Sequence, residues 1–233
     1  MRKDRKMELP VFSLEPSVIC CDLCALGEEI RTWEQAGVTA LHIDVLDGAF
    51  APSLPVGIDT FLQLSERTEL PFDVHIMSRN NAWFIDQCIR MNAARICFQV
   101  EGEPDPAGML ARIRKAGISP GLAFSPDTPV ESVCGLLDEA DFILLMRINP
   151  GYAGFAGESV RTDLDDKIRH ARKLLDAGRT GRDIVIDGRV TFDDIPRLKA
   201  LGATVMVGGS RSLFSGKDYK GNFRKAKALY LGE

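Results

Sequence analysis

The segment LHIDVLDGAFAPSLPVG spans residues 41–57. Its first five residues, together with the preceding Ala40, form the short apolar run ALHIDV (40–45). A run of this length and composition indicates a buried β-strand. Side chains alternate across a strand, so His42 and Asp44, two positions apart, point to the same face. Polar groups inside a buried strand are uncommon, because such residues ordinarily lie in solvated loops. The segment therefore predicts a strand whose polar face has a function.

Seven further apolar runs of the same kind lie on either side of this segment, spaced by roughly 20 to 35 residues. Each is short enough for a strand and too short for a typical helix. They are VFSLEPSVI (11–19), FDVHIM (72–77), ARICFQV (94–100), GLAF (121–124), FILLMRI (142–148), DIVIDG (183–188) and VMVGG (205–209).

Segments with apolar residues at helical spacing separate these runs, and Gly37, Gly117 and Gly178 are natural stops for three of them. Alternating strands and helices predict a parallel sheet, and eight such units close into a (β/α)8 TIM barrel. An open, doubly wound α/β sheet uses the same repeat and stays an alternative. The segments with helical spacing include residues 24–37, 83–94, 109–117, 130–140 and 164–178.

The length of 233 residues suits one large domain, and the 45% of apolar residues supply a sizeable core. We expect a short extension over residues 1–10 and a single barrel domain over residues 11–233. The net charge of −4, with both signs spread along the chain, gives no indication of a nucleic-acid partner. An anionic substrate would have to be held by local donors.

Targeting signals are not apparent, because no apolar stretch follows the charged start MRKDRKM. No run approaches the roughly 18 apolar residues of a membrane-spanning helix, so we expect a cytoplasmic protein without a membrane partner. Cys21 and Cys24 have redox or zinc-site spacing, but no second pair completes a four-ligand site. We interpret the six cysteines as reduced packing thiols: Cys20, Cys21, Cys24, Cys88, Cys97 and Cys134.

Polar residues also mark other strand ends, which is where barrel active sites form. His75 lies in the third run and Asp187 in the seventh. Inward-facing His42, Asp44, His75 and Asp187 would make a nitrogen and oxygen site for zinc, iron, manganese or cobalt. A lone strand histidine is usually a core residue, so the combination carries the prediction. The third histidine, His170, lies in a polar helix and is expected to be solvated.

Three glycine-bearing loops follow late strands: residues 149–154, 187–189 and 208–210. Glycine lets backbone amides approach an anion closely. The last two loops follow the seventh and eighth strands, where barrels frequently bind phosphate. They therefore predict a phosphate site, although tight turns alone would also require glycine.

The sequence resembles the ribulose-phosphate 3-epimerase family over about residues 10 to 230. The resemblance rests on Pro16-Ser17 and on the following stretches, which occur in the family's order: LHIDVLDGAFAPSLPVG (41–57), FDVHIM (72–77), DFILLMRINPGYAG (141–154), VIDG (185–188) and VGGS (207–210).

This resemblance implies an isomerase with a ribulose-phosphate-binding barrel, which epimerises a ketose phosphate at C3. The expected reaction converts D-ribulose 5-phosphate to D-xylulose 5-phosphate through a metal-stabilised enediolate. It implies that one divalent metal binds His42, Asp44, His75 and Asp187, and that Asp44 and Asp187 are also the acid/base pair. A homo-oligomer, dimer or hexamer, is expected. The expected substrate-binding residues are Ser17, Met77, Met146, Gly151, Gly154, Gly188, Arg189, Gly208, Gly209 and Ser210.

Several positions depart from the family pattern and keep other functions open. The family usually has methionine at Leu46, His-x-Glu at Gln99-Val-Glu101, a small hydroxyl residue at Arg147, glutamine at Phe155 and glycine at Arg189. Arg189 could grip the phosphate, crowd its pocket, or point to solvent while its amide serves. The alternatives are a 3-epimerase of another ketose phosphate such as allulose 6-phosphate, a decarboxylating lyase, and a non-catalytic sugar-phosphate-binding barrel.

Overall fold

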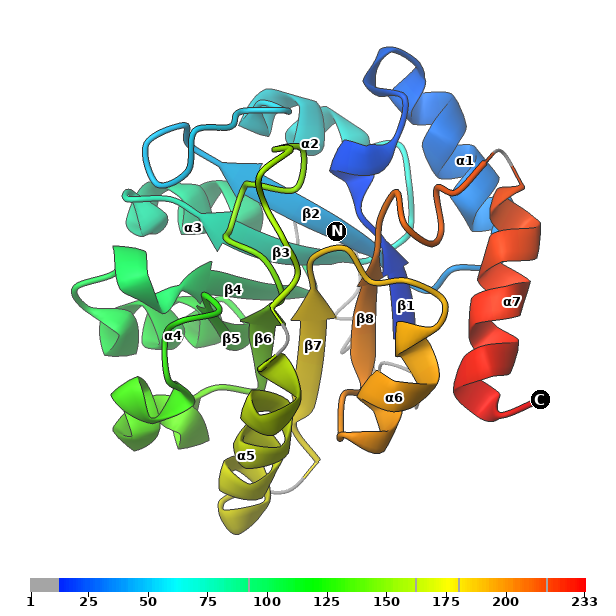
Figure 1. Ribbon diagram of the computed structural model, residues 1–233. Coiled ribbons are helices and arrows are strands. Elements are labelled where there is room, and N and C mark those ends of the chain that lie inside the picture. The colour runs from blue at the N-terminus through cyan, green and yellow to red at the C-terminus, as the bar shows by residue number, and fades with distance from the viewer. Residues whose placement is uncertain (1–12, 92, 162, 180, 217) are drawn as a thin grey trace.

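The computed structural model describes residues 13–233 apart from residues 92, 162, 180 and 217. In this part, eight parallel strands alternate with helices (Figure 1), and each strand coincides with one of the eight predicted apolar runs. The predicted extension over residues 1–10, and residues 11 and 12 of the first run, lie outside the described residues. The strands are β1 (Ser13–Pro16), β2 (Leu41–Leu46), β3 (Phe72–Met77), β4 (Arg95–Gln99), β5 (Ser119–Phe124), β6 (Phe142–Met146), β7 (Asp183–Asp187) and β8 (Val205–Gly208).

The sheet closes into a barrel. Its strand order is β1-β8-β7-β6-β5-β4-β3-β2, so the first and last strands of the chain are neighbours, with Ser13 opposite Val205. The remaining seam joins β1 to β2 through a parallel bridge between Ser17 and His42. The barrel prediction is therefore confirmed over the open sheet.

Helices surround the strands on the outside of the barrel, as Figure 1 shows. The α-helices are α1 (Leu26–Ala36), α2 (Ile58–Ser65), α3 (Asn81–Arg90), α4 (Pro106–Lys115), α5 (Leu164–Ala177), α6 (Asp194–Ala200) and α7 (Tyr219–Leu231). Short 3-10 segments are η1 (Val18–Cys20), η2 (Leu23–Ala25), η3 (Val100–Gly102) and η4 (Val130–Glu139). No helix in the described part of the chain has the length and apolar content to span a bilayer.

The segment expected to be helical over residues 130–140 is a 3-10 helix, η4, and not an α-helix, and its backbone is non-helical at Val133. Two β-branched valines and Gly135 make this a poor α-helix sequence. Gly37 ends α1 in the left-handed conformation at φ +85°, as a glycine stop does. Gly178 follows α5 with φ −99°, so its role as a stop is not a left-handed one.

The cysteines are all free thiols. Cys21, Cys88 and Cys97 are buried and Cys20 is half-buried, which agrees with packing roles for these four. Cys24 and Cys134 are exposed, so the interpretation as packing thiols is wrong for them.

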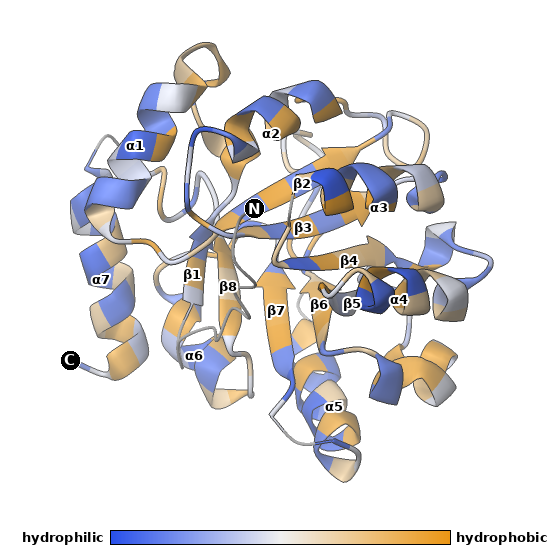
Figure 2. Ribbon diagram, turned by 180° about the vertical axis from the view of Figure 1, so that it is seen from behind, coloured by the Kyte–Doolittle hydropathy of each residue, from blue (hydrophilic) through white to orange (hydrophobic). Residues whose placement is uncertain are grey.

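Two large apolar cores flank the sheet, and a third, small cluster of Leu46, Ala51 and Met77 lies at the ends of β2 and β3. The larger lies between strands and helices, where Figure 2 shows apolar strands and helices with polar outer faces. The smaller fills part of the barrel interior with side chains from β4 to β8, including Phe142 and Val207. The rest of the interior is polar, with buried Glu15, Asp73 and Arg95. This division places the polar groups together on the β1 to β4 side.

Trp33 of α1 anchors the closure of the helical layer. Its ring is 0% exposed, stacks on Tyr219 at 4.6 Å between centroids and meets Phe214 edge-on at 5.0 Å.

We expect Trp33→Ala to lower the free energy of unfolding by about 3–5 kcal/mol, because a large cavity forms. Denaturant unfolding followed by circular dichroism measures this. Trp83→Ala is the matched control, since Trp83 is 45% exposed; an equal loss in both variants would contradict the assignment.

Candidate active site

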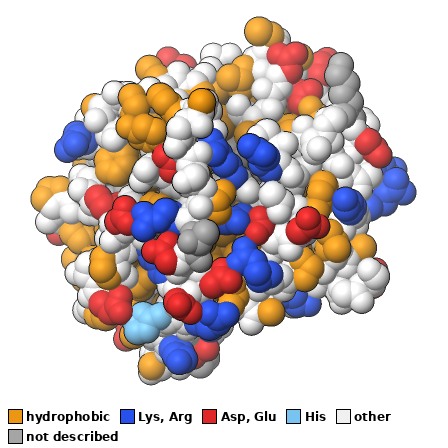
Figure 3. Space-filling view, in the orientation of Figure 1, with side chains coloured by type: hydrophobic (Ala, Val, Ile, Leu, Met, Phe, Trp, Pro, Cys, Tyr) orange, Lys and Arg blue, Asp and Glu red, His pale blue; other side chains and the backbone are white. Residues whose placement is uncertain are grey.

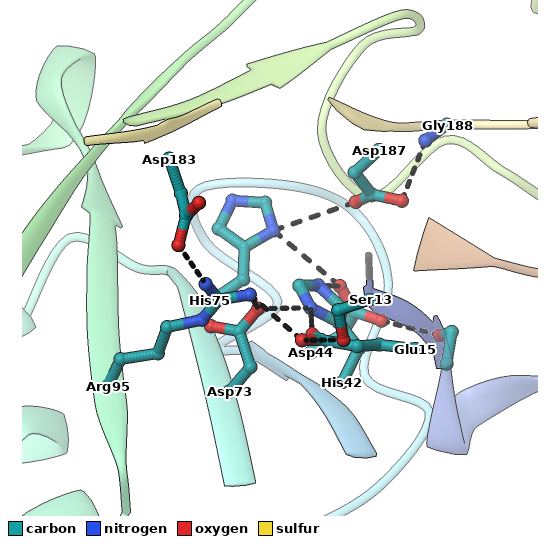
Figure 4. Close-up of polar contacts among 11 residues, drawn as sticks. Ser13, Glu15, His42, Asp44, Asp73, His75, Arg95, Asp183, Asp187 and Gly188 are labelled. Atoms are coloured by element: carbon teal, nitrogen blue, oxygen red, sulfur yellow. Dashed lines mark hydrogen bonds and ion pairs between the residues drawn. The ribbon is translucent and has the colours of Figure 1, made fainter. Parts of the chain in front are cut away.

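Four side chains from three strands converge inside the barrel: His42 and Asp44 from β2, His75 from β3 and Asp187 from the carboxyl end of β7 (Figure 4). One nitrogen or oxygen of each lies within 4.8 Å of the others. Asp44 Oδ1 is 3.5 Å from His42 Nε2 and 3.6 Å from His75 Nδ1, and Asp187 Oδ2 is 3.7 Å from that same His75 nitrogen. The alternation of β2 and the register of Asp44 with His75 produce this convergence.

The chemistry of this cluster fits a divalent cation. Both histidines are fully buried and Asp44 is 4% exposed. His42 Nε2 and His75 Nδ1 have no hydrogen-bond partner among the described residues, although both point at the carboxylates. Buried polar atoms are ordinarily satisfied, and two imidazoles with two carboxylates are a ligand set for zinc, iron, manganese or cobalt. The cluster could therefore hold one metal ion.

The electrostatics of the cluster also favour positive charge. Burial alone would lower the pKa of both imidazoles, but Asp44 and Asp73 hold the pKa of His42 above its ordinary value, and Asp187 and Asp44 do so for His75. Burial would raise the pKa of Asp44, yet the two imidazoles, led by His42, hold it well below its usual range. A metal ion would compete with protons for these atoms.

Neighbouring groups fix both carboxylates. Ser17 Oγ donates to Asp44 Oδ2 at 2.7 Å, which leaves Oδ1 toward the imidazoles. The backbone amide of Gly188 donates to Asp187 Oδ1 at 2.6 Å, which leaves Oδ2 toward His75. Each aspartate therefore presents one defined oxygen to the cluster.

A second buried group lies beneath the cluster and was missed from the sequence. Arg95 Nη2 donates to Glu15 Oε1 at 2.9 Å and to Asp73 Oδ2 at 2.7 Å, while Ser13 Oγ donates to Glu15 at 3.0 Å. Glu15, His42 and Asp73 also have metal-ligand spacing. The guanidinium of Arg95 already bridges the carboxyl groups of Glu15 and Asp73. The positive charge in this second group is therefore supplied by Arg95, and a metal ion is not required there.

Gln99 of β4 contacts the other side of His75. Its amide nitrogen lies 2.9 Å from His75 Nε2, and its amide oxygen lies 3.5 Å from Ser125 Oγ. Gln99 is fully buried. The sequence marked this position only as a departure from the family pattern.

The loop after β6, residues 147–161, crosses the mouth of the barrel toward the loop after β2 (Figure 1). Gly151 has φ +80°, and a Cβ there would lie 2.4 Å from the Cβ of Ala51 and 3.0 Å from Leu46. Only glycine permits this approach. Met77 and Met146, at the ends of β3 and β6, are buried beneath. Gly154 has no such neighbour.

Asp47 braces the same rim and was also missed from the sequence. Its carboxylate accepts from the amides of Ala49, Phe50 and Arg79 and from Ser78 Oγ, at 2.7 to 2.9 Å. These bonds tie the loop after β2 to the loop after β3. Its position directly after the strand was a signal for a loop-organising role.

The expected phosphate loops follow β7 and β8. Gly188 has φ +105° and a Cβ there would lie 2.9 Å from Ile148, while a Cβ on Gly208 would lie 2.4 Å from Leu213. Gly209 lies against Cys20, and Ser210 is exposed. Close packing is thus one reason for glycine at positions 188 and 208.

Arg189 turns its side chain to the β6–α5 loop. Its guanidinium donates to the carbonyls of Ala153 at 2.9 Å and Phe155 at 3.1 Å, and to that of Glu158. Arg189 has φ +53°, and it is the one non-glycine residue with a left-handed backbone among those described. The side chain therefore fastens one loop of the mouth to another.

The remaining departures also have protein partners. Arg147 is 5% exposed and forms a bidentate pair with Asp194, with bonds of 2.7 and 2.9 Å. Phe155 is 42% exposed and its ring lies 4.8 Å from that of Tyr152. His170 is half-exposed, as expected, and pairs with Glu131.

The sequence of this chain is similar to those of known proteins. The sequence profile described as the Ribulose-phosphate 3 epimerase family matches residues 13–214. The chain belongs to this family. Its similarity to the ribulose-phosphate 3-epimerase of Chlamydia pneumoniae is 36% identity, covering 84% of this chain and 85% of that protein. The similarity to the enzyme of the same name from Buchnera aphidicola is 34%, covering 90% of each. The expected enzyme class, an epimerase within the isomerases, is confirmed.

Solved structures support the fold. The tryptophan synthase alpha subunit of Campylobacter jejuni superposes with a TM-score of 0.64 at 13% identity, covering 95% of this chain and 96% of that one. Phosphoribosyl anthranilate isomerase of Thermus thermophilus gives 0.64 at 16% identity, covering 95% and 99%. At these identities the likeness concerns the barrel alone.

Replacing Arg189 should free the loop that it fastens. We expect Arg189→Gly to speed amide hydrogen exchange in residues 153–158, because three carbonyl contacts are lost. Glycine also removes left-handed strain of about 1 kcal/mol, which offsets part of the energy of the lost contacts, so the global unfolding free energy should change little. Mass spectrometry of exchanged peptides measures the first effect and chemical denaturation the second. Unchanged exchange in this loop would show that Arg189 does not restrain it.

Proposed function

We propose that the protein catalyses metal-dependent epimerisation at C3 of a ketose phosphate, interconverting D-ribulose 5-phosphate and D-xylulose 5-phosphate. The observation that carries this proposal is the convergence of His42, Asp44, His75 and Asp187 within 4.8 Å at the mouth of an epimerase-family barrel. A pure sugar-phosphate binder would have no use for two oriented acids in a buried site.

The residues that would hold the metal are His42, Asp44, His75 and Asp187. Two imidazole nitrogens without a hydrogen-bond partner in the described part of the chain, together with two oriented carboxylates, support this assignment. A divalent cation bound there would supply positive charge that stabilises the enediolate formed when C3 loses its proton. Zinc, iron, manganese and cobalt all suit nitrogen and oxygen donors.

Asp44 and Asp187 would act as the acid/base pair. The proton on C3 is acidic because the carbon lies next to the C2 carbonyl. Inversion requires a base on one face of the reacting carbon and an acid on the other. Asp44 comes from β2 and Asp187 from β7, and each holds one oxygen in a fixed orientation. One would take the C3 proton, and the other would deliver a proton to the opposite face.

The rest of the substrate would be held around this centre. Met77 and Met146 would form an apolar wall that limits access of water. Ser17 would contact the sugar as well as Asp44. The phosphate would lie against the loops that follow β7 and β8, including Gly188, Gly208, Gly209 and Ser210. Gly151 and Gly154 would cover it from the β6–α5 loop.

The arginine departures do not require a different sugar. Arg147 is paired with Asp194, and the guanidinium of Arg189 is taken up by loop carbonyls. Arg189 would therefore contribute its backbone amide to phosphate. On the face shown in Figure 3, side chains of both charge signs intermingle, which is consistent with anion binding by local donors. Homo-oligomerisation stays a prediction.

The two-acid mechanism predicts that Asp187→Asn folds normally and loses about 10³-fold in kcat, because an amide cannot exchange the proton. Steady-state kinetics and circular dichroism check the two parts. Asp193→Asn, an exposed carboxylate on the same loop, is the matched control and should keep activity. Near-normal turnover by Asp187→Asn would overturn the mechanism.

The substrate assignment predicts deuterium incorporation at C3. Metal-loaded protein would be incubated in deuterated water with D-ribulose 5-phosphate and, separately, with allulose 6-phosphate. NMR should show C3 exchange and formation of D-xylulose 5-phosphate. Exchange on allulose 6-phosphate alone would reassign the sugar, release of carbon dioxide would indicate a lyase, and binding without exchange would indicate a sensor.

A further inference from the structure

The two histidines of the cluster present different ring nitrogens to it. His42 presents Nε2 and His75 presents Nδ1, and both atoms lack a hydrogen-bond partner among the described residues. A neutral imidazole has one lone pair and one N–H. For each ring to offer a lone pair to a cation, the opposite nitrogen has to carry the proton. The two rings therefore need opposite tautomers.

Asp73 determines the tautomer of His42. Its Oδ2 lies 3.3 Å from His42 Nδ1 and 2.7 Å from Arg95 Nη2. Both Asp73 and Arg95 are essentially buried, at 0% and 2% exposure. The paired guanidinium stabilises Asp73 as a carboxylate, which can only accept. The proton of His42 is then on Nδ1, and Nε2 keeps its lone pair.

Gln99 occupies the corresponding place behind His75. In the structure its amide nitrogen lies 2.9 Å from His75 Nε2. Two N–H groups cannot share a hydrogen bond, so protonation of Nε2 requires the amide to present Oε1 instead. In the structure, Ser125 Oγ lies 3.5 Å from the amide oxygen of Gln99. When the amide is turned so that its two terminal atoms exchange places, Nε2 of Gln99 lies near Ser125 Oγ instead. A hydroxyl oxygen can accept, so both ends of the turned amide are compatible with their partners.

We propose that Asp73 and Gln99 are positioning residues that impose opposite tautomers on the two histidines. Asp73 accepts the Nδ1 proton of His42, and Oε1 of Gln99 accepts the Nε2 proton of His75. This rests on the proposed metal site, and it assigns a task to the glutamine that departs from the family pattern. The two supports differ in charge, since Asp73 is anionic and Gln99 is neutral.

The tautomers can be read directly. The chain holds three histidines, and His170→Gln leaves only the two rings of interest. Long-range proton–nitrogen NMR of this variant loaded with zinc should show one ring protonated at Nδ1 and the other at Nε2. The Nδ1-protonated ring should be lost in the double variant that also carries His42→Gln. Two rings in the same tautomer, or loss of the Nε2-protonated ring instead, would overturn the proposal.

The role of Gln99 can be separated from packing by two variants of similar volume. Gln99→Met removes the acceptor, and Gln99→Glu keeps it. Cobalt affinity, measured by chelator competition, should weaken about 10 to 100-fold in Gln99→Met and stay near the wild-type value in Gln99→Glu. The melting temperature of each metal-free variant controls for stability. Equal affinities in the two variants would remove the role of Gln99.

Failure of the metal site itself would look different. If the wild-type protein takes up no cobalt, and His42→Gln and His75→Gln change nothing, the metal proposal fails together with this inference. If the wild-type protein binds cobalt at these residues but the Gln99 variants are indistinguishable from it, only the positioning role fails.

Discussion

The ion pair of Arg95 with Asp73 lies in the barrel interior, where neither side chain reaches solvent. Its energetic importance comes from what surrounds it. Glu15 shares the same guanidinium, and burial raises the pKa of Glu15 to about 8, so the group holds less negative charge than two free carboxylates would. Removing one partner of a buried pair leaves an uncompensated charge that costs several kcal/mol. The lower half of the polar interior is therefore neutralised from within.

The upper half has no such partner. No lysine or arginine of the described residues forms an ion pair with Asp44 or Asp187, and the ion-pair partners of these two carboxylates are the imidazoles of His42 and His75. Two carboxylates beside two buried imidazoles form a cluster that favours bound positive charge, either as protons on the imidazoles or as a metal ion. Arg95 supplies positive charge to the buried carboxyl groups in the lower half of the interior, and the proposed metal ion would supply it to those in the upper half. Asp73 links them, because it contacts both Arg95 and His42.

Sequence reasoning found the strands because apolar runs are local, and it placed His42 with Asp44 because alternation is fixed by backbone geometry. The same rule applied to FDVHIM would have placed Asp73 beside His75 on the inner face. The alternation rule could not predict the contact of Glu15 with Arg95, because the rule is local and 80 residues separate the two side chains. The partners of Arg189 are loop carbonyls, which every residue possesses, so no pattern of side chains could reveal them.

The seam of the barrel has a consequence for how the protein is made. Strand β1 emerges first during synthesis, but its partner β8 spans Val205–Gly208, close to the end of the 233-residue chain. Asp187 likewise follows His42, Asp44 and His75 by more than a hundred positions. The chain order therefore supplies three of the four clustered side chains before β7 and β8 are available to close the sheet. The complete cluster arises only after β7 and β8 leave the ribosome, so the finished barrel rather than the growing polypeptide is the species able to assemble the site.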